Sequence, residues 1–182
     1  MPATLEDLAA TPGKAELLGD HLEVTSPTGF LPGHAAGEIF ASLRAYARRT
    51  RSGIAVGDNV GFVVDLPGRR SFSPDAAFFT GALSGMKFLE GAPAFAVEVR
   101  SEGDYGAAAE AAMEGKRADY SAAGTAVVWD VDLLSQDVVR AYRPDAPARP
   151  VLFRRGGLAD AVPGWSVPVD ELFPDGYFPR EA

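Results

Sequence analysis

Two acidic residues and a lysine in the middle of the chain have the types and the order expected of a phosphodiesterase site. Asp75 follows Pro74, Glu98 lies 98 − 75 = 23 positions further along, and Lys116 comes after it. Carboxylate oxygens are hard ligands that suit Mg²⁺ or Mn²⁺, and such an ion polarises a phosphoryl oxygen and lowers the pKa of a bound water. A lysine nearby would orient or help deprotonate that water and offset charge on the phosphate. These residue types therefore predict metal-dependent hydrolysis of a phosphodiester bond.

Glu98 stands in a segment that the alternation of residue types predicts to be a strand. Positions 95, 97 and 99 are apolar and share one face, whereas Ala96, Glu98 and Arg100 share the other. A charge at the end of an apolar strand needs a partner. Two interpretations are open: a structural Glu98–Arg100 pair, or a ligand position at a strand end. Asp75 would begin the preceding strand, because Pro74 favours a strand start or an edge.

Lys116 is predicted to lie on a helix from Tyr105 to Ala123, with Asp104 as its N-cap. At about 100° per residue, one face of this helix is mostly apolar and consists of Ala109, Ala112, Met113, Lys116, Tyr120 and Ala123. A lysine in the middle of such a face either extends its ammonium to water or meets an acid.

The ordered motifs of the chain resemble those of the Uma2 family. They are Pro74-Asp75, Glu98-Val99-Arg100-Ser101, Lys116-Arg117 with Tyr120, Ala122-Ala123-Gly124 and Val127-Val128-Trp129-Asp130-Val131-Asp132. Residues 16–24 are similar to the family's N-terminal hairpin, and residues 163–173 are similar to its C-terminal end. The Pro-Asp pair alone is unspecific, whereas the ordered set is fairly specific and covers nearly the whole chain.

The resemblance implies a restriction-endonuclease-like member of the PD-(D/E)xK nuclease superfamily, which would act on DNA. It matches Asp75 to the acid of the first motif and Glu98 to the acid of the second. The expected ligands of Mg²⁺ or Mn²⁺ are Asp75, Glu98 and Val99. Arg100 occupies the position of the superfamily's usual lysine, and in this family that lysine is moved to the following helix, where it matches Lys116. Lys116 is thus the expected catalytic cation, with Arg100 secondary.

The first long helix departs from the family pattern. Relatives often place a His-Gly pair at its start, where this chain has Ala36-Gly37, and His34 lies two positions too early. Glu38, near the same helix start, is expected to supply a further catalytic acid instead. His34 is therefore not expected to be catalytic.

Both the resemblance and the hydrophobic pattern predict a single domain over residues 1–182. Its fold class would be mixed α/β (α+β), a restriction-endonuclease-like sheet flanked by helices. Helices are expected at 4–10, 35–50 and 105–123, with a helical turn at 170–173. Strands are expected as an N-terminal hairpin at 15–18 and 21–25, at 54–56, 60–65, 75–79, 95–100 and 125–131, and as a C-terminal antiparallel pair at 138–142 and 151–154. Residues 67–70 are expected to form a turn and 81–91 a loop.

The composition describes an ordinary globular chain of 182 residues, 47% hydrophobic and 23% charged, with no cysteine. Without cysteine, the chain has neither disulfides nor a thiolate metal site, so a metal must be held by oxygen or by histidine. No apolar run approaches the roughly 20 residues that span a bilayer, and no signal peptide is visible. A cytoplasmic protein is expected.

The net charge of −8 disfavours tight binding of duplex DNA, which usually requires a basic face. Arg44, Arg48 and Arg51 could form a phosphate-contacting stripe on the first long helix, although a solvated helix face is the favoured interpretation. We therefore expect weak, salt-sensitive DNA binding, either through these arginines or through a basic groove that a homodimer would build, and no interaction with membranes.

Motifs of other catalytic classes are absent, since the sequence has no Walker loop, no Gly-x-Gly-x-x-Gly after a strand and no serine elbow. Two further functions stay open. The first is a nucleic-acid or protein binding module on a nuclease scaffold with weak or absent turnover, which the acidic charge and Arg100 favour. The second is a structural oligomerising protein with buried ion pairs at Glu98, Arg100 and Lys116. Metal binding and turnover on DNA would separate these functions.

Overall fold

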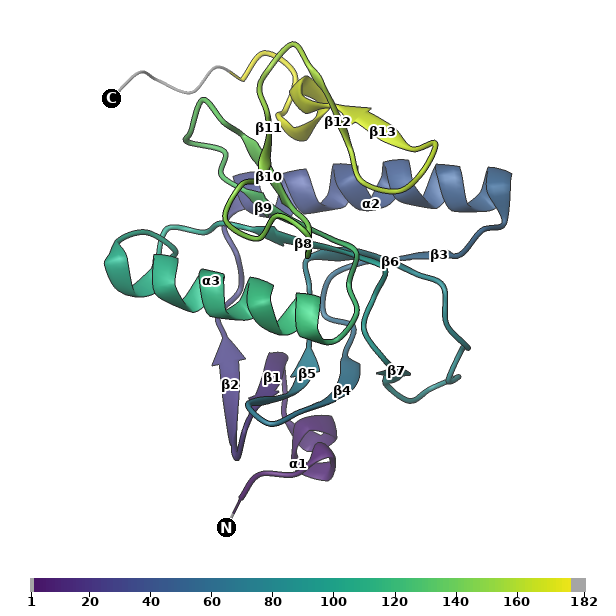
Figure 1. Ribbon diagram of the computed structural model, residues 1–182, viewed down its shortest axis with the longest axis vertical. Coiled ribbons are helices and arrows are strands. Elements are labelled where there is room, and N and C mark those ends of the chain that lie inside the picture. The colour runs from purple at the N-terminus through teal and green to yellow at the C-terminus, as the bar shows by residue number, and fades with distance from the viewer. Residues whose placement is uncertain (1, 178–182) are drawn as a thin grey trace.

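A computed structural model describes residues 2–177 and is built on one mixed six-stranded sheet (Figure 1). The strand order is β11-β10-β9-β8-β6-β3. The strands are β3 (Ile54–Val56), β6 (Ala76–Phe79), β8 (Phe95–Val99), β9 (Val127–Val131), β10 (Val139–Tyr142) and β11 (Val151–Phe153). Only β8 and β9 are parallel among these neighbours, and α3 (Ala107–Ala122) connects them, as a parallel crossover requires. The predicted mixed sheet flanked by helices is confirmed.

The helix α2 (Phe30–Thr50) covers one face of this sheet (Figure 1). Its buried Ile39, Leu43 and Tyr46 pack in the core cluster that also contains Phe95 and Trp129. The C-terminal hairpin β12 (Leu158–Asp160) and β13 (Ser166–Pro168) and the 3₁₀ helix η1 (Val169–Leu172) complete this layer. Most of the α2 side is thus an apolar core.

The start of α2 lies earlier than predicted, at residue 30 rather than 35. Pro32 and Gly33, which favoured a loop, lie within the first turn of the helix. Proline is tolerated there because the first N–H groups of a helix have no intrahelical partner. The helix ends at Thr50, and Arg51 adopts the left-handed conformation with φ 54°. Gly53 is needed for close approach, since a Cβ there would lie 2.6 Å from the Phe79 carbonyl oxygen.

The opposite face of the sheet carries α3 and a layer of short strands (Figure 1). This layer contains α1 (Leu5–Ala10), the hairpin β1 (Lys14–Leu18) and β2 (His21–Thr25), and a three-stranded sheet of β5 (Arg69–Phe72), β4 (Phe62–Leu66) and β7 (Leu89–Glu90). The hairpin is confirmed. The predicted turn at 67–70 was wrong in part, because β5 already begins at Arg69. The predicted loop at 81–91 contains β7, whose pairing with distant β4 leaves no local signal.

The helix α3 begins after Gly106 rather than after Asp104. The Asp104 carboxylate accepts a hydrogen bond from the Ser101 N–H at 2.7 Å instead of capping the helix. Tyr120 is the fully buried residue of α3 and stacks on Phe72, with ring centroids 3.9 Å apart. Ala109, Ala112, Met113 and Lys116 of the predicted apolar face line a pocket, which explains why they are not buried as Tyr120 is. None of the helices within residues 2–177 is long and apolar enough to cross a bilayer.

Candidate active site

Asp75 lies just before the start of β6, and Glu98 lies near the end of β8. In the antiparallel pairing of these strands Ala76 faces Val97, which brings the two acids to the same end of the strand pair. Asp75 directly precedes β6 rather than belonging to it. Its N–H donates to the Val97 carbonyl at 2.9 Å, and its Oδ2 accepts from the Val99 N–H at 2.7 Å. Backbone contacts with β8 therefore fix the position of Asp75.

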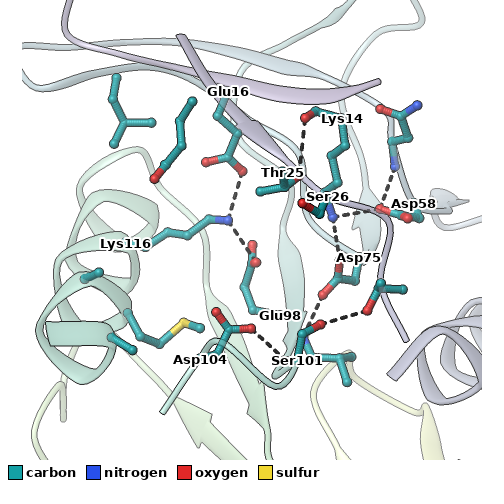
Figure 2. A pocket seen from close by; sticks show the side chains of 18 of the residues that line it. Lys14, Glu16, Thr25, Ser26, Asp58, Asp75, Glu98, Ser101, Asp104 and Lys116 are labelled. Atoms are coloured by element: carbon teal, nitrogen blue, oxygen red, sulfur yellow. Dashed lines mark hydrogen bonds and ion pairs between the residues drawn. The ribbon is translucent and has the colours of Figure 1, made fainter. Parts of the chain in front are cut away.

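Lys116 reaches this pair of acids from α3. Its Nζ lies 2.8 Å from Glu98 Oε2 and 2.9 Å from Glu16 Oε1 (Figure 2). The Tyr120 hydroxyl donates to the other Glu98 oxygen at 2.7 Å. Of the two alternatives for a lysine on the apolar face, the structure therefore has the one in which the ammonium meets acids.

The hairpin strand β1 supplies two residues that the sequence analysis missed, Lys14 and Glu16. Lys14 Nζ lies 2.5 Å from Asp75 Oδ1 and 2.7 Å from Asp58 Oδ1 (Figure 2). Glu16 is buried and accepts from the Ser73 N–H at 2.8 Å. The only available signal was period-2 alternation, which puts positions 14 and 16 on one face of a short strand. The tertiary contact with Asp75 spans 61 positions and has no local signature.

The side chain of Glu16 connects the hairpin to both α3 and β5. Besides contacting Lys116, it forms an ion pair with Arg69, 2.6 Å from NH1 to Oε2. Arg69 in turn contacts Asp119 of α3, with 2.8 Å between Nε and Oδ2. Glu16 thus holds Lys116 from the side opposite to Glu98, which fixes the ammonium between two carboxylates.

Arg100 does not join this group, although it leaves β8 on the same side as Glu98. Its guanidinium makes a bidentate pair with Asp130, at 2.7 and 2.8 Å, and it also contacts Glu110. Arg117 adds a further contact to Asp130 at 3.0 Å. Of the two interpretations left open for Glu98, the structural Glu98–Arg100 pair is therefore wrong, because each residue has other partners. With its guanidinium held in this way, Arg100 lies outside the pocket lining, and the structure puts Lys116, rather than Arg100, beside Glu98.

The pKa values of the two central groups move in the same direction. Burial raises the pKa of Glu98 to about 7, with Lys116 opposing this shift and the nearby Asp75 and Glu16 adding to it. Burial would lower the pKa of Lys116, but the carboxylates of Glu16 and Glu98 outweigh burial and raise it. Lys116 is therefore a cation at neutral pH and is suited to stabilising negative charge. The expectation that it helps to deprotonate water loses support.

These residues line an open pocket of about 610 Å³ between α3 and the β1–β2 hairpin. Lys14, Glu16, Asp75, Glu98 and Lys116 all contribute to its lining, as does Val99. Two predicted groups are elsewhere. Glu38 is exposed on α2 and does not line the pocket, and Arg44 and Arg48 are exposed on the same helix, across the sheet from α3. Exposure of these arginines agrees with a solvated helix face.

The donor chemistry of the pocket fits a hard divalent ion. Within residues 2–177, no group of three or more His, Asp or Glu side chains is arranged to hold a metal. Mg²⁺ is nevertheless often bound by one or two carboxylates, with waters and substrate phosphates as its other ligands. Asp75 and Glu98 are such a pair, and the Lys14 ammonium beside Asp75 indicates that a positive charge is stabilised at this position. What Val99 contributes in the structure is its N–H to Asp75.

A mixed sheet with two neighbouring acids and a lysine defines the restriction-endonuclease-like class of fold. The chain belongs to the Uma2 family, described as "Putative restriction endonuclease", whose model matches residues 2–173. The fold is similar to that of a solved protein from Anabaena variabilis ATCC 29413, described as a putative nuclease belonging to DUF820. The two chains are 16% identical with a TM-score of 0.73, over 94% of this chain and 98% of that one. No curated protein matches this chain.

Proposed function

We propose that this protein is a divalent-metal-dependent nuclease that hydrolyses phosphodiester bonds of DNA in the pocket between α3 and the β1–β2 hairpin. The observation that carries the proposal is the arrangement of Asp75, Glu98 and Lys116. Two carboxylates lie at the same end of the neighbouring strands β6 and β8, and an ammonium group lies 2.8 Å from one of them. Membership of a restriction-endonuclease-like family supports the same class of reaction.

Asp75 and Glu98 would hold Mg²⁺ or Mn²⁺. When bound, the ion would polarise the phosphoryl oxygen and lower the pKa of a water. The Val99 N–H orients Asp75, and the Tyr120 hydroxyl orients Glu98. Each carboxylate thus accepts a hydrogen bond from a neighbouring residue, which keeps its oxygens in place before substrate binds.

Lys116 would stabilise the negative charge that builds on the phosphate during hydrolysis. Its raised pKa keeps it protonated, and Glu16 limits its movement. A preorganised cation stabilises developing negative charge more strongly in a site that excludes water, because charge is screened less there than in bulk solvent. Lys14 offers a second ammonium on the Asp75 side of the pocket.

The test is cleavage of single-stranded, duplex and branched DNA with Mn²⁺ or Mg²⁺, together with calorimetry of Mn²⁺ binding. We expect Asp75→Asn and Glu98→Gln to lose both metal binding and cleavage. Glu114→Gln, on the exposed side of α3 and outside the pocket, is the control for removing one carboxylate. If Asp75→Asn and Glu98→Gln bind Mn²⁺ as the wild type does, the proposed site is wrong.

A DNA-binding module without turnover is the second candidate function. It is favoured by the ion pairs that the pocket carboxylates already make, Asp75 with Lys14 and Glu98 with Lys116. A metal would have to compete with these lysines. Metal-independent DNA binding without cleavage would favour this second function over the first.

A further inference from the structure

The wall of the pocket formed by α3 is fastened to the opposite wall by ion pairs. Lys116 contacts Glu16 of β1 at 2.9 Å, and Asp119 contacts Arg69 of β5 at 2.8 Å. Glu16 and Arg69 are themselves paired and buried, so the two contacts form one continuous charged chain. We call this set of four residues the clasp. It prevents α3 from moving away from the hairpin without breaking buried ion pairs, which is costly.

A second connection lies at the other side of the pocket. Thr28, in the linker between β2 and α2, shares a hydrogen bond with Ser101, with 2.8 Å between their hydroxyl oxygens. The linker residues Ser26 and Pro27 line the pocket as well. The site is therefore partly enclosed, with the clasp on one side and this linker on the other.

Because the pocket is partly enclosed, little of the side chains of the two acids is exposed to solvent. The side chains of Glu98 and Asp75 are only 9% and 20% exposed. The pocket volume of about 610 Å³ is within the range of roughly 300–1,000 Å³ typical of small-ligand sites. A phosphate must enter this space to reach Asp75 and Glu98. The backbone of a continuous duplex is rigid and wide, whereas an unpaired strand is flexible enough to turn a single phosphate inward.

The charges around the pocket disfavour any nucleic acid that needs many phosphate contacts, and this applies more strongly to a duplex than to a short unpaired strand. Carboxylates outnumber basic groups among the described lining residues; the acids are Glu16, Glu23, Asp58, Asp75, Glu98, Asp104 and Asp119, and the basic residues are Lys14, Arg69 and Lys116. Duplex binding depends on neutralising many phosphates along an extended basic surface. The apolar residues Ala109, Ala112 and Met113 of α3 line the same pocket and offer a surface for unstacked bases.

We infer that the substrate of this site is an unpaired DNA strand and that the interior of a duplex is excluded. The inference rests on the proposed nuclease function, since it names the substrate class of the same pocket. An unpaired strand exposes the faces of its bases for stacking, which a duplex does not. The clasp determines this preference, because it sets the distance between α3 and the hairpin.

The experiment compares three substrates with Mn²⁺: labelled oligothymidylate, the same strand annealed to oligodeoxyadenylate, and the small diester bis(p-nitrophenyl) phosphate. We expect the wild type to cut the unpaired strand at least about tenfold faster than the duplex, a difference equivalent to about 1.4 kcal/mol. Fluorescence anisotropy of the two DNA probes should show the same preference in binding. Asp119→Asn removes a charge from the clasp and should lower the ratio of single-strand to duplex cleavage. Glu114→Gln removes a carboxylate from the same helix outside the pocket and should leave this ratio unchanged.

Failure of the inference is distinguishable from failure of the proposed function. Equal or faster cleavage of the duplex overturns the substrate inference while the nuclease function stands. If none of the three substrates is hydrolysed, the nuclease function fails, and anisotropy then decides only the preference of the pocket for an unpaired strand as a ligand. Tighter binding of the unpaired strand then supports it, and equal binding, tighter duplex binding or no binding overturns it.

Discussion

Two clusters of charged residues lie side by side on the same face of β8 and β9, yet they differ in what they can do. Glu98 and Asp130 are direct neighbours in the parallel register of these strands. Asp130 has no exposed side-chain surface, and two arginines satisfy its oxygens. Glu98 lines a pocket and pairs with a lysine that is itself 19% exposed. Burial of charge is thus common to both clusters, and access to the pocket separates a candidate site from a structural ion-pair network.

The kinds of cation differ in the same way. Arg100 presents a planar fork that binds Asp130 through two parallel hydrogen bonds, a geometry that suits a permanent pair. Lys14 and Lys116 are point charges on flexible stems, each lying between two carboxylates. An ammonium can leave one partner for a substrate phosphate at less cost than a bidentate guanidinium. We therefore expect substitutions in the Arg100 cluster to change stability and those in the pocket to change activity.

The largest effect on stability should come from Arg100→Met. The variant leaves Asp130 buried with only Arg117 as a partner. Removing one member of a buried pair costs about 3–5 kcal/mol, and urea unfolding would measure this loss. Arg48→Met on the exposed side of α2 is the control and should change the free energy of unfolding by less than about 0.5 kcal/mol. A stable Arg100→Met that has lost cleavage would instead assign Arg100 the lysine role of its motif position.

Lys116→Met should have the largest effect on activity. Methionine keeps the helix propensity and much of the side-chain volume, but it removes the charge beside Glu98. We expect cleavage to fall by about 10²-fold or more, as for the loss of one preorganised stabilising group. Calorimetry should show that Mn²⁺ binding is retained, since the lysine is not a ligand. Normal cleavage by this variant would show that Lys116 only neutralises Glu16 and Glu98.

The sequence was sufficient to predict the parts of this arrangement that have local signatures. Alternation in residues 95–99 placed Glu98 on the correct face, and the helical period placed Lys116 toward the sheet. Both depend on residues close together in the chain. The same holds for the N-terminal hairpin and the C-terminal antiparallel pair, whereas the mixed sheet was predicted from the family resemblance together with the hydrophobic pattern.

The contribution of β1 had no such signature. Lys14 and Glu16 acquire their roles only when the hairpin packs against β5 and beneath α3, through contacts that span more than 50 positions. Glu38 shows the opposite error. Its place in the motif order suggested a catalytic acid, but the helical period turns it to the exposed side of α2, while Ile39 next to it is buried. Helix phase was therefore a better guide to this residue than motif order.

A smaller effect is expected from pH, because the pKa of Glu98 is raised from 4.5 to about 7. Between these values the folded protein binds more protons than the unfolded chain, so the free energy of unfolding should rise as pH falls from 7 to 4.5. One pKa unit corresponds to about 1.4 kcal/mol, which puts the effect on the order of 1–3 kcal/mol. Glu16 does not cancel this rise, because its lowered pKa acts below pH 4.5.

The measurement is urea unfolding at pH 5 and pH 8 without divalent metal, for the wild type, Glu98→Gln and Glu114→Gln. From pH 8 to pH 5, the free energy of unfolding should rise more in the wild type and in Glu114→Gln than in Glu98→Gln. The same pH dependence in all three proteins would mean that Glu98 does not take up a proton in this range. Arg100 itself should contribute nothing to this slope, because its pKa is raised further above the measured range.

The smallest effect should come from charge reversal at Arg44 and Arg48. Both side chains are exposed on α2, and the sheet separates this helix from the pocket (Figure 1). Charges in water separated by more than the Debye length of about 8 Å at physiological salt are largely screened. Arg44→Glu with Arg48→Glu should therefore leave cleavage of an unpaired strand unchanged within about twofold, equivalent to less than about 0.5 kcal/mol.

The assay is cleavage at two salt concentrations, with Lys14→Met as the contrasting loss of a positive charge inside the pocket. If the α2 variant loses cleavage while Lys14→Met does not, nucleic acid approaches from the α2 side, and the pocket that contains Asp75 and Glu98 is not where the strand binds.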